Sequence, residues 1–198
     1  MNALSLSHYI LDHYSNISPM KLQKLLYYVK VWGVVSNEHL LVADFEKWSY
    51  GPVNNEVYQE YKNFGKDPIT KINHNGTQPP QPLKKTIDFI LDCYTPYDAL
   101  TLSAMTHEDK PWQETPLNTI ISDKVIKSFY SKLPFAKNFP FDAGKPFYPV
   151  QTDLHYAYIF DMNKKDAESL KVYSSYNEYK QQLKKTQQQF TSWFKNIA

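Results

Sequence analysis

The residues best suited to acid–base chemistry gather at one point of the chain, where Thr106 and His107 are followed by Glu108 and Asp109. A histidine flanked by carboxylates can titrate near neutral pH and serve as a general acid or base. The same residues also suit the polar end of a helix, just before Pro111-Trp112, where side chains hydrogen-bond the last backbone groups. We favour the structural interpretation and keep an enzyme using His107 as the alternative.

Other common chemistries lack the residues that they need. The six histidines are scattered, and no two of them are four residues apart, so no helical metal-binding pair is predicted. Cys93 is the only cysteine and stands beside apolar residues of a predicted helix, which favours a buried, unreactive thiol over a nucleophile. The five glycines are too far apart for a phosphate-binding loop or a G-x-S-x-G nucleophile elbow. We therefore expect no metal and no cofactor.

Two aromatic turns are candidates for either the core or a contact surface. Trp48, Tyr50, Gly51 and Pro52 form the first, and Trp112 follows a proline in the second. Tryptophan and tyrosine bury a large area at a small entropy cost, so they serve both in cores and as anchors of protein interfaces, and the usual burial of tryptophan favours the core. Gly51 should adopt a backbone conformation that side chains resist, because the chain turns sharply there before a proline.

Composition and charge restrict the class of protein. The 198 residues are 42% hydrophobic and 21% charged, which predicts a folded chain with one core rather than a membrane span or a disordered tail. All 22 basic residues are lysines and the net charge is +2. The absence of arginine, the usual reader of guanine and phosphate, disfavours specific DNA binding, although an AT-rich coding genome would also explain it. The first ten residues resemble no signal peptide, so we expect a cytoplasmic protein with no membrane partner.

Apolar periodicity predicts six helices before residue 135 and therefore a mainly α fold. Ser18 should cap the second helix with Pro19 at its first position, and Ser122 should cap the sixth. Residues 40–50 are expected to turn into a short extended segment that ends at Gly51-Pro52. The expected helices cover about 6–14, 19–35, 52–64, 83–94, 96–107 and 122–133.

The rest of the chain is less regular until its end. We expect a surface loop over 66–82, an extended aromatic segment over 134–150 and a short β element over 154–160. Ser175 and Glu178 have the spacing of a capping box, which predicts a long amphipathic helix to the end of the chain. The apolar positions of that helix that we propose for partner binding are Tyr179, Leu183, Phe190, Trp193, Phe194 and Ile197.

Three motifs in order carry a resemblance to a known family. Ser18-Pro19-Met20-Lys21-Leu22-Gln23-Lys24-Leu25-Leu26-Tyr27-Tyr28 comes first, then Trp48-Ser49-Tyr50-Gly51-Pro52-Val53 with Glu56-Val57-Tyr58, and finally Leu102-Ser103 with Thr106-His107 and Pro111-Trp112. Over about residues 5–133 the chain resembles the SocA/Panacea antitoxin domain, also called the phage-associated GepA-like family.

The resemblance implies a mainly helical antitoxin that neutralises a cognate toxin, encoded beside it, by direct protein–protein binding. Some relatives instead act as adaptors that present the toxin to a Clp-type protease, which is the alternative partner. The family-defining positions are Lys21, Leu22, Trp48, Tyr50, Gly51, Pro52, Val53, Thr106, His107, Pro111 and Trp112.

The resemblance also suggests a division of the chain into two parts. Residues 1–145 would form the helical domain, and 146–198 would form an extension that departs from the family. The C-terminal helix can pack on the core or lie in a groove of the toxin. We predict that deleting 175–198 leaves a folded domain that cannot neutralise.

Overall fold

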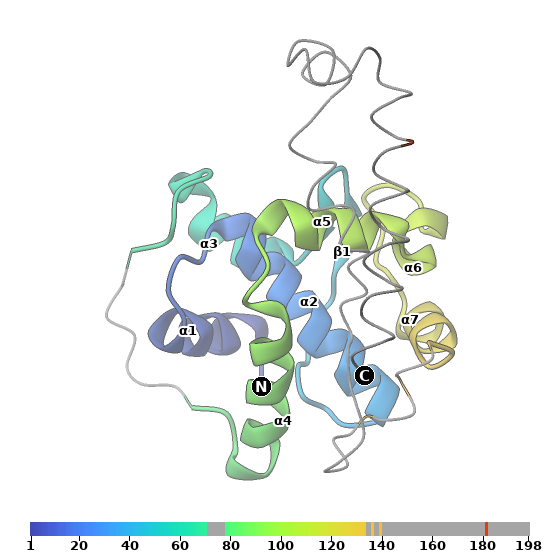
Figure 1. The fold of residues 1–198 in the computed structure, drawn as a ribbon, viewed down its shortest axis with the longest axis horizontal. Coiled ribbons are helices and arrows are strands. Elements are labelled where there is room, and N and C mark those ends of the chain that lie inside the picture. The colour runs from blue at the N-terminus through green and yellow to red at the C-terminus, as the bar shows by residue number, and fades with distance from the viewer. Residues whose placement is uncertain (71–77, 134–135, 137–138, 140–180, 182–198) are drawn as a thin grey trace. The chain divides into compact units, whose positions relative to one another are not determined.

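A computed structural model describes residues 1–70, 78–133, 136, 139 and 181 of the chain. Its contacts divide the chain into two compact units, Met1–Val150 and Gln151–Ala198, and all described residues except Gln181 belong to the first. This unit is mainly helical, as predicted (Figure 1). The elements that the structure describes are α1 (Ala3–His13), α2 (Pro19–Ser36), β1 (Glu46–Trp48), β2 (Gly51–Val53), α3 (Asn55–Tyr61), the 3-10 helix η1 (Lys62–Phe64), α4 (Gln81–Tyr94), α5 (Ala99–Glu108), α6 (Lys110–Glu114) and α7 (Asp123–Tyr130).

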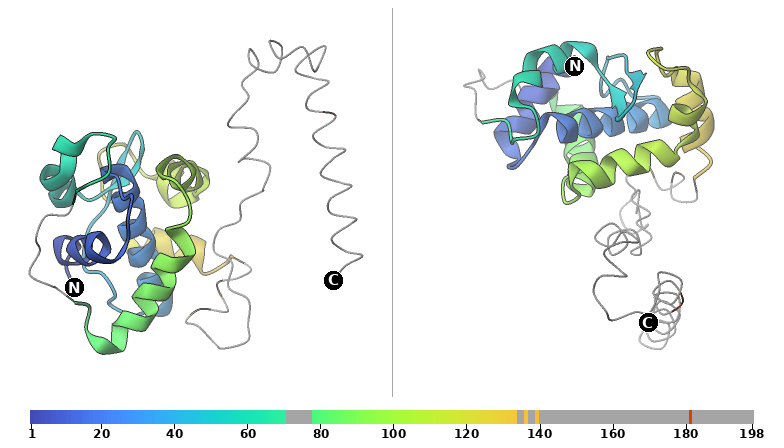
Figure 2. Two further views of the ribbon diagram at one scale, coloured as in Figure 1. Left: turned by 60° about the vertical axis from the view of Figure 1, so that its left-hand side comes forward. Right: turned by 90° about the horizontal axis from the view of Figure 1, so that it is seen from above.

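Helix α2 is the centre of this unit and contacts α1, α3, α4, α5, α7 and β2. As predicted, Ser18 caps it by accepting a hydrogen bond from the Lys21 amide, with Pro19 at the first position. Figure 2 shows α2 running between the hairpin on one side and α5 on the other. Because neighbours surround it, α2 is buried around its whole circumference from Leu22 to Val29, and not along one stripe alone.

Aromatic contacts join α2 to the elements around it. The ring of Tyr28 stacks on Tyr94 of α4 with their centroids 4.0 Å apart, and Trp32 Nε1 donates to the Tyr94 hydroxyl at 2.9 Å. Trp32 also packs edge-on against Tyr130 of α7. The large buried aromatics therefore fix the positions of α4 and α7 on the central helix.

The prediction that a helix begins at Pro52 is wrong, because this residue lies in a β-hairpin. β1 and β2 pair antiparallel, with Trp48 opposite Gly51 and Lys47 opposite Pro52. The helix starts three residues later, where the Asn54 side chain accepts from the Val57 amide and caps α3. A hairpin was not predicted because two strands of three residues carry too little alternation to be recognised.

The start of the fifth predicted helix and one additional short helix also differ from the expectation. We expected the fifth helix to open at Thr95-Pro96, but Thr95 ends α4, and Asp98 caps α5 by accepting from the Thr101 amide at 2.7 Å. Helix α6 was not expected, because its five residues are too few to show a helical period. The segments predicted over 134–150, 154–160 and 175–198 lie outside the described residues, apart from the single positions Ala136, Phe139 and Gln181.

Candidate functional site

The hairpin turn brings the second family motif onto the central helix. Gly51 has a φ of +102°, which confirms the predicted conformation that side chains resist. A Cβ placed on Gly51 would lie 2.7 Å from the Lys24 Nζ atom and 2.8 Å from the Thr106 Oγ1 atom. Only glycine therefore lets the hairpin approach α2 and α5 this closely.

Lys24 reaches from α2 to the hairpin and is only 1% exposed. Its Nζ atom donates to the Pro52 carbonyl oxygen at 3.1 Å. Burial removes the ammonium from water and lowers its pKa to about 7. The sequence contains Lys24 within the first motif, but the position is not among the predicted site residues. The missed signal is a lysine inside a helix that is buried all round.

Helix α5 secures the hairpin from the opposite side. Ser103 Oγ donates to the Tyr50 carbonyl oxygen at 2.9 Å, and Thr106 Oγ1 donates to the Ser103 carbonyl at 2.7 Å. The Tyr50 side chain itself is 71% exposed, so the favoured core position is wrong for this residue. The two-residue loop between β1 and β2 carries the ring outward while its backbone stays fixed.

A pair of stacked rings closes the junction of α5 and α6. His107 lies on Trp112 with ring centroids 4.1 Å apart, and Trp112 Nε1 donates to the Trp48 carbonyl at 3.1 Å. Burial, and then the positive charges of Lys24 and Lys47, lower the pKa of His107, so its ring is neutral at pH 7. The ring thus packs at the helix end beside Trp112, but its Nε2 atom has no hydrogen-bond partner among the described residues, so the hydrogen-bonding role that we favoured for His107 stays a prediction.

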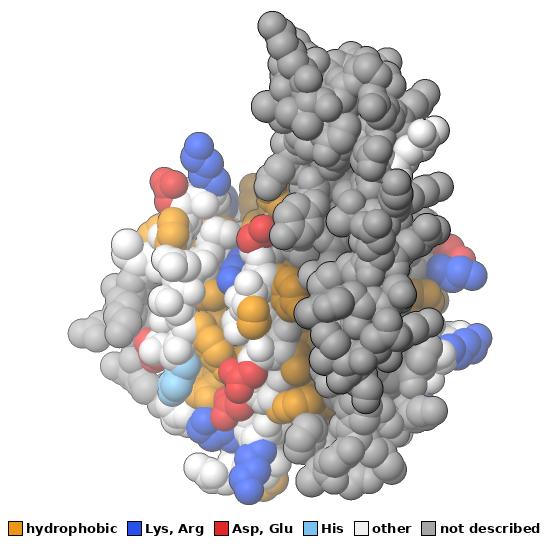
Figure 3. Space-filling view, viewed as in Figure 1, with side chains coloured by type: hydrophobic (Ala, Val, Ile, Leu, Met, Phe, Trp, Pro, Cys, Tyr) orange, Lys and Arg blue, Asp and Glu red, His pale blue; other side chains and the backbone are white. Residues whose placement is uncertain are grey.

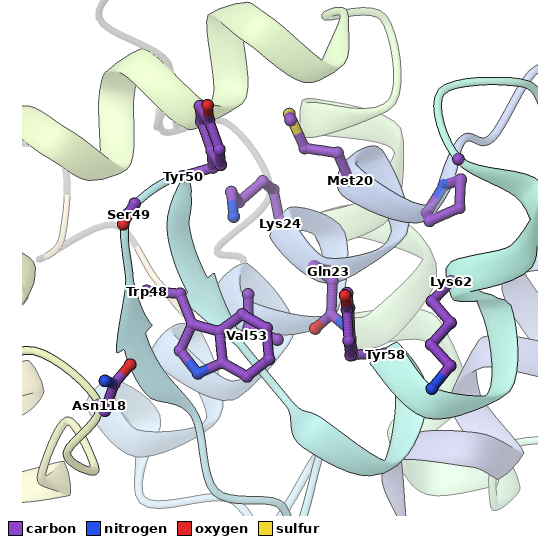
Figure 4. A pocket seen from close by; sticks show the side chains of 12 residues that line it. Met20, Gln23, Lys24, Trp48, Ser49, Tyr50, Val53, Tyr58, Lys62 and Asn118 are labelled. Atoms are coloured by element: carbon purple, nitrogen blue, oxygen red, sulfur yellow. The ribbon is translucent and has the colours of Figure 1, made fainter.

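A cleft opens between α2, the hairpin and the end of η1, with a volume of about 490 Å³ (Figure 4). Trp48 and Tyr58 meet edge to face on one wall, with centroids 4.8 Å apart. Figure 4 shows Lys24 extending toward the hairpin between the side chains of Tyr50 and Trp48. The residues that line the cleft are Pro19, Met20, Gln23, Lys24, Trp48, Ser49, Tyr50, Val53, Tyr58, Lys62, Gly65 and Asn118.

Gln23 holds the base of this cleft in place. Its side-chain amide forms two hydrogen bonds with the backbone of Asn54, accepting from the amide at 2.8 Å and donating to the carbonyl at 3.0 Å. Asn54 Nδ2 in turn donates to the Asp44 carbonyl at 2.9 Å. Buried side-chain bonds of this kind fix the hairpin and α3 against α2. The sequence offered no sign of this pairing, because its partners are 31 residues apart.

A second buried polar group lies under α7, where the Tyr130 hydroxyl donates to the Asp109 carboxylate. Burial raises the pKa of Asp109 to about 7, against the lowering effect of the Tyr130 bond. Burial, and then the Asp109 charge, raise the pKa values of the Tyr27 and Tyr28 hydroxyls, which lie in the same buried region. This group joins α7 to the α5–α6 junction within the core.

The other predicted site residues are a lysine that ties two helices together, three buried positions and six positions near the C-terminus. Lys21 Nζ donates to the Thr95 carbonyl at 2.7 Å and so ties α2 to the end of α4. Leu22, Val53 and Pro111 are buried. The six proposed partner-binding positions near the C-terminus, Tyr179, Leu183, Phe190, Trp193, Phe194 and Ile197, lie outside the described residues.

The structure also bears on the predictions about Cys93, metal binding and membrane association. Burial raises the pKa of the Cys93 thiol to about 11, which disfavours the thiolate that a nucleophile would need. Among the residues that the structure describes, no three of the types His, Cys, Asp and Glu gather as metal ligands would, and no helix is long and apolar enough to cross a membrane. On the face seen in Figure 3, lysines and acidic side chains of the described part are interspersed.

Residues 22–113 match the family model described as antitoxin SocA-like, Panacea domain. The match begins in α2, includes the hairpin, and ends in α6, so it contains every family-defining position except Lys21. It is shorter than the predicted resemblance over 5–133 and omits α1 and α7. No curated protein and no solved structure matches the chain.

Proposed function

We propose that this protein neutralises a cognate toxin by binding it directly and without catalysis, because residues 22–113 match the family model described as antitoxin SocA-like, Panacea domain. The family match is the observation that carries the proposal. The toxin is a protein encoded beside this chain, and the interaction requires no cofactor. The mechanism is steric occlusion of the toxin's working surface.

The hairpin turn and its cleft are the proposed contact surface. Tyr50 is 71% exposed, yet its backbone is held by the Ser103 hydrogen bond and by the tight approach of Gly51 to Lys24. A rigid, exposed aromatic loses little entropy on binding, which is why such residues often dominate interface energies. The turn therefore offers an anchor already fixed in its binding conformation.

The α5–α6 junction has a supporting role in this proposal. His107 is neutral at pH 7, stacks on Trp112 and does not line the cleft described above. Trp112 donates to the carbonyl of Trp48 at 3.1 Å and so holds the first strand of the hairpin. The family positions of this junction accordingly shape the contact surface from beneath.

The test uses the product of the adjacent gene, expressed in cells with and without this protein. We expect co-expression to restore growth, and Tyr50→Ala to reduce the affinity of the purified pair by at least tenfold. Val42→Ala is the matched control, because Val42 is 65% exposed but does not line the cleft. Equal losses from both variants would place the contact surface elsewhere, and an adjacent product that is harmless to cells would remove the proposed function.

Residues 175–198 are proposed as a second contact surface, lying in a groove of the toxin through Tyr179, Trp193 and their apolar neighbours. We expect a chain ending at Ser174 to unfold cooperatively and to lose neutralisation. Loss of cooperative unfolding would mean that this segment belongs to the core instead. Full neutralisation by the truncated chain would mean that it has neither role.

A further inference from the structure

The floor of the cleft carries an amine whose donors are mostly unused by the described residues. The Lys24 Nζ atom donates to the Pro52 carbonyl, and in the described part of the chain it forms no salt bridge with a carboxylate. An ammonium group has three N–H donors, and a buried charge without a partner is unfavourable. A position that served packing alone would be filled better by methionine or leucine.

The hairpin is built to leave room for this amine. The left-handed conformation of Gly51 and its missing Cβ let the turn pass directly over the Lys24 side chain, where a Cβ would be 2.7 Å from Nζ. A buried lysine without a carboxylate partner in the described part of the chain and a glycine that makes room for it thus occur at one place. A buried charge left without a counter-charge in a cleft is a feature of binding sites.

The charged residues that line the cleft determine which side chain of a partner it can bind. Lys24 at the floor and Lys62 at the rim are the charged residues that line the cleft, and both are positive. The rings of Trp48 and Tyr58 form a wall suited to an apolar stem. A lysine or arginine from a partner would be repelled, and a purely apolar side chain would leave the ammonium without acceptors. A carboxylate supplies acceptor oxygens and the opposite charge.

We infer that the cleft is a carboxylate-binding site in which Lys24 receives an aspartate or glutamate side chain presented by the protein partner. This inference rests on the proposed function and adds to it the chemistry by which the toxin is recognised. The carboxylate accepts hydrogen bonds from the Lys24 ammonium, and its aliphatic stem lies against Trp48.

The first experiment does not depend on the toxin. The full chain, labelled for NMR, is titrated with the blocked peptide acetyl-Leu-Glu-Leu-amide, with its glutamine counterpart and with inorganic phosphate. We expect the glutamate peptide to shift the Gly51 amide and the Trp48 indole signals, with an affinity at least tenfold above that of the glutamine peptide. Equal affinities, or tighter binding of phosphate, would overturn the inference.

Variants assign the preference to the amine. Lys24→Met should abolish the preference for glutamate, whereas Lys85→Met, which removes an exposed charge from α4, should leave it within twofold. Lys24→Gln keeps a polar donor and should also lose the preference, because the charge is what selects the carboxylate. Preference retained in either Lys24 variant would contradict the inference.

The second experiment uses the toxin encoded by the adjacent gene. Lys24→Met should weaken the complex at least tenfold, and one aspartate or glutamate of the toxin, changed to its amide, should weaken it equally without adding to the loss in the double variant. A toxin that binds Lys24→Met as tightly as the unaltered chain would leave the proposed function standing and refute the carboxylate site. A toxin that binds neither would refute the proposed function, and the peptide titration would then decide on the site alone.

Discussion

Replacing Lys24 by methionine should stabilise the protein at neutral pH. Lys24 is 1% exposed, and its one hydrogen bond in the described part of the chain goes to the Pro52 carbonyl. Methionine has a similar length and keeps the contacts of the lysine stem while it removes the buried charge. A residue retained for binding rather than for folding is expected to behave in this way.

The magnitude follows from the pKa of the lysine in the two states. Burial lowers this pKa from 10.5 to about 7, which corresponds to about 5 kcal/mol at about 1.4 kcal/mol per pKa unit. Loss of the hydrogen bond leaves the Pro52 carbonyl unpaired and costs about 1–3 kcal/mol in return. We therefore expect a net gain of about 2–4 kcal/mol at pH 7, or roughly 5–10 °C in Tm.

The stability difference between Lys24→Met and the unaltered chain should depend on pH. Between pH 7 and 10.5 the unfolded chain keeps the Lys24 proton and the folded chain does not. The amount by which Lys24 lowers the free energy of unfolding is therefore greatest below pH 7 and disappears as the pH rises toward 10.5. The advantage of Lys24→Met should shrink over the same interval. His107 and Asp109 also titrate abnormally, but they are present in both proteins, so comparing the two at each pH leaves the effect of Lys24.

The assay is urea unfolding of the unaltered chain, Lys24→Met and Lys85→Met at pH 7 and pH 9.5. Lys85→Met should change stability little at either pH, because that lysine is exposed. The reasoning is refuted if Lys24→Met is less stable than the unaltered chain at pH 7 and follows the same pH dependence. That result would mean that the ammonium is already paired in the folded chain.

Three other variants test the framework of the site. Gly51→Ala should lower the free energy of unfolding by about 2–4 kcal/mol in thermal melts, because the new side chain meets both the positive φ and the contact with Lys24. Gly65→Ala is the control and should lose about 1 kcal/mol, because nothing lies near its Cβ position. Equal losses in the two variants would show that the close approach of Gly51 to Lys24 is unimportant. His107→Gln should fold and still neutralise in the growth assay, and a folded variant that binds the toxin without neutralising it would indicate catalysis. Tyr130→Phe should raise the pKa of Asp109 further, because the ionised carboxylate loses its hydrogen-bond donor. Urea unfolding should show a loss of stability that grows above pH 7. A loss independent of pH would contradict the role of Tyr130 as a donor to the Asp109 carboxylate.

Much of the fold could be predicted from local signals. Ser18 with Pro19 and Ser122 marked helix starts, because a capping side chain and a proline act on the first turn alone. The helix start predicted at Pro52 is wrong because a proline suits both the first turn of a helix and an edge strand. Only the pairing of Lys47 with Pro52 shows that the residue belongs to a strand. Helix α6 has five residues, fewer than a periodic pattern requires.

The site was harder to predict than the fold because it depends on contacts between distant segments. Lys24 stands in the sequence as one of several lysines, and only the packing of the hairpin on α2 makes it a buried amine. His107 looked like the chemical centre because of its acidic neighbours. In the structure its ring stacks on Trp112, and Asp109 turns to Tyr130. Sequence neighbours on a helix end point in different directions, so adjacency alone did not define the site.

The central claim is neutralisation by direct binding, and a measurement on two purified proteins tests it most directly. The toxin encoded by the adjacent gene is assayed for its activity while this protein is added in increasing amounts, with no protease present, and the complex is weighed by light scattering. If neutralisation occurs by direct binding, we expect a stable complex and a loss of toxin activity that is complete at a fixed ratio of the two proteins. A toxin that stays fully active in the presence of excess protein, or that forms no complex with it, would contradict the account.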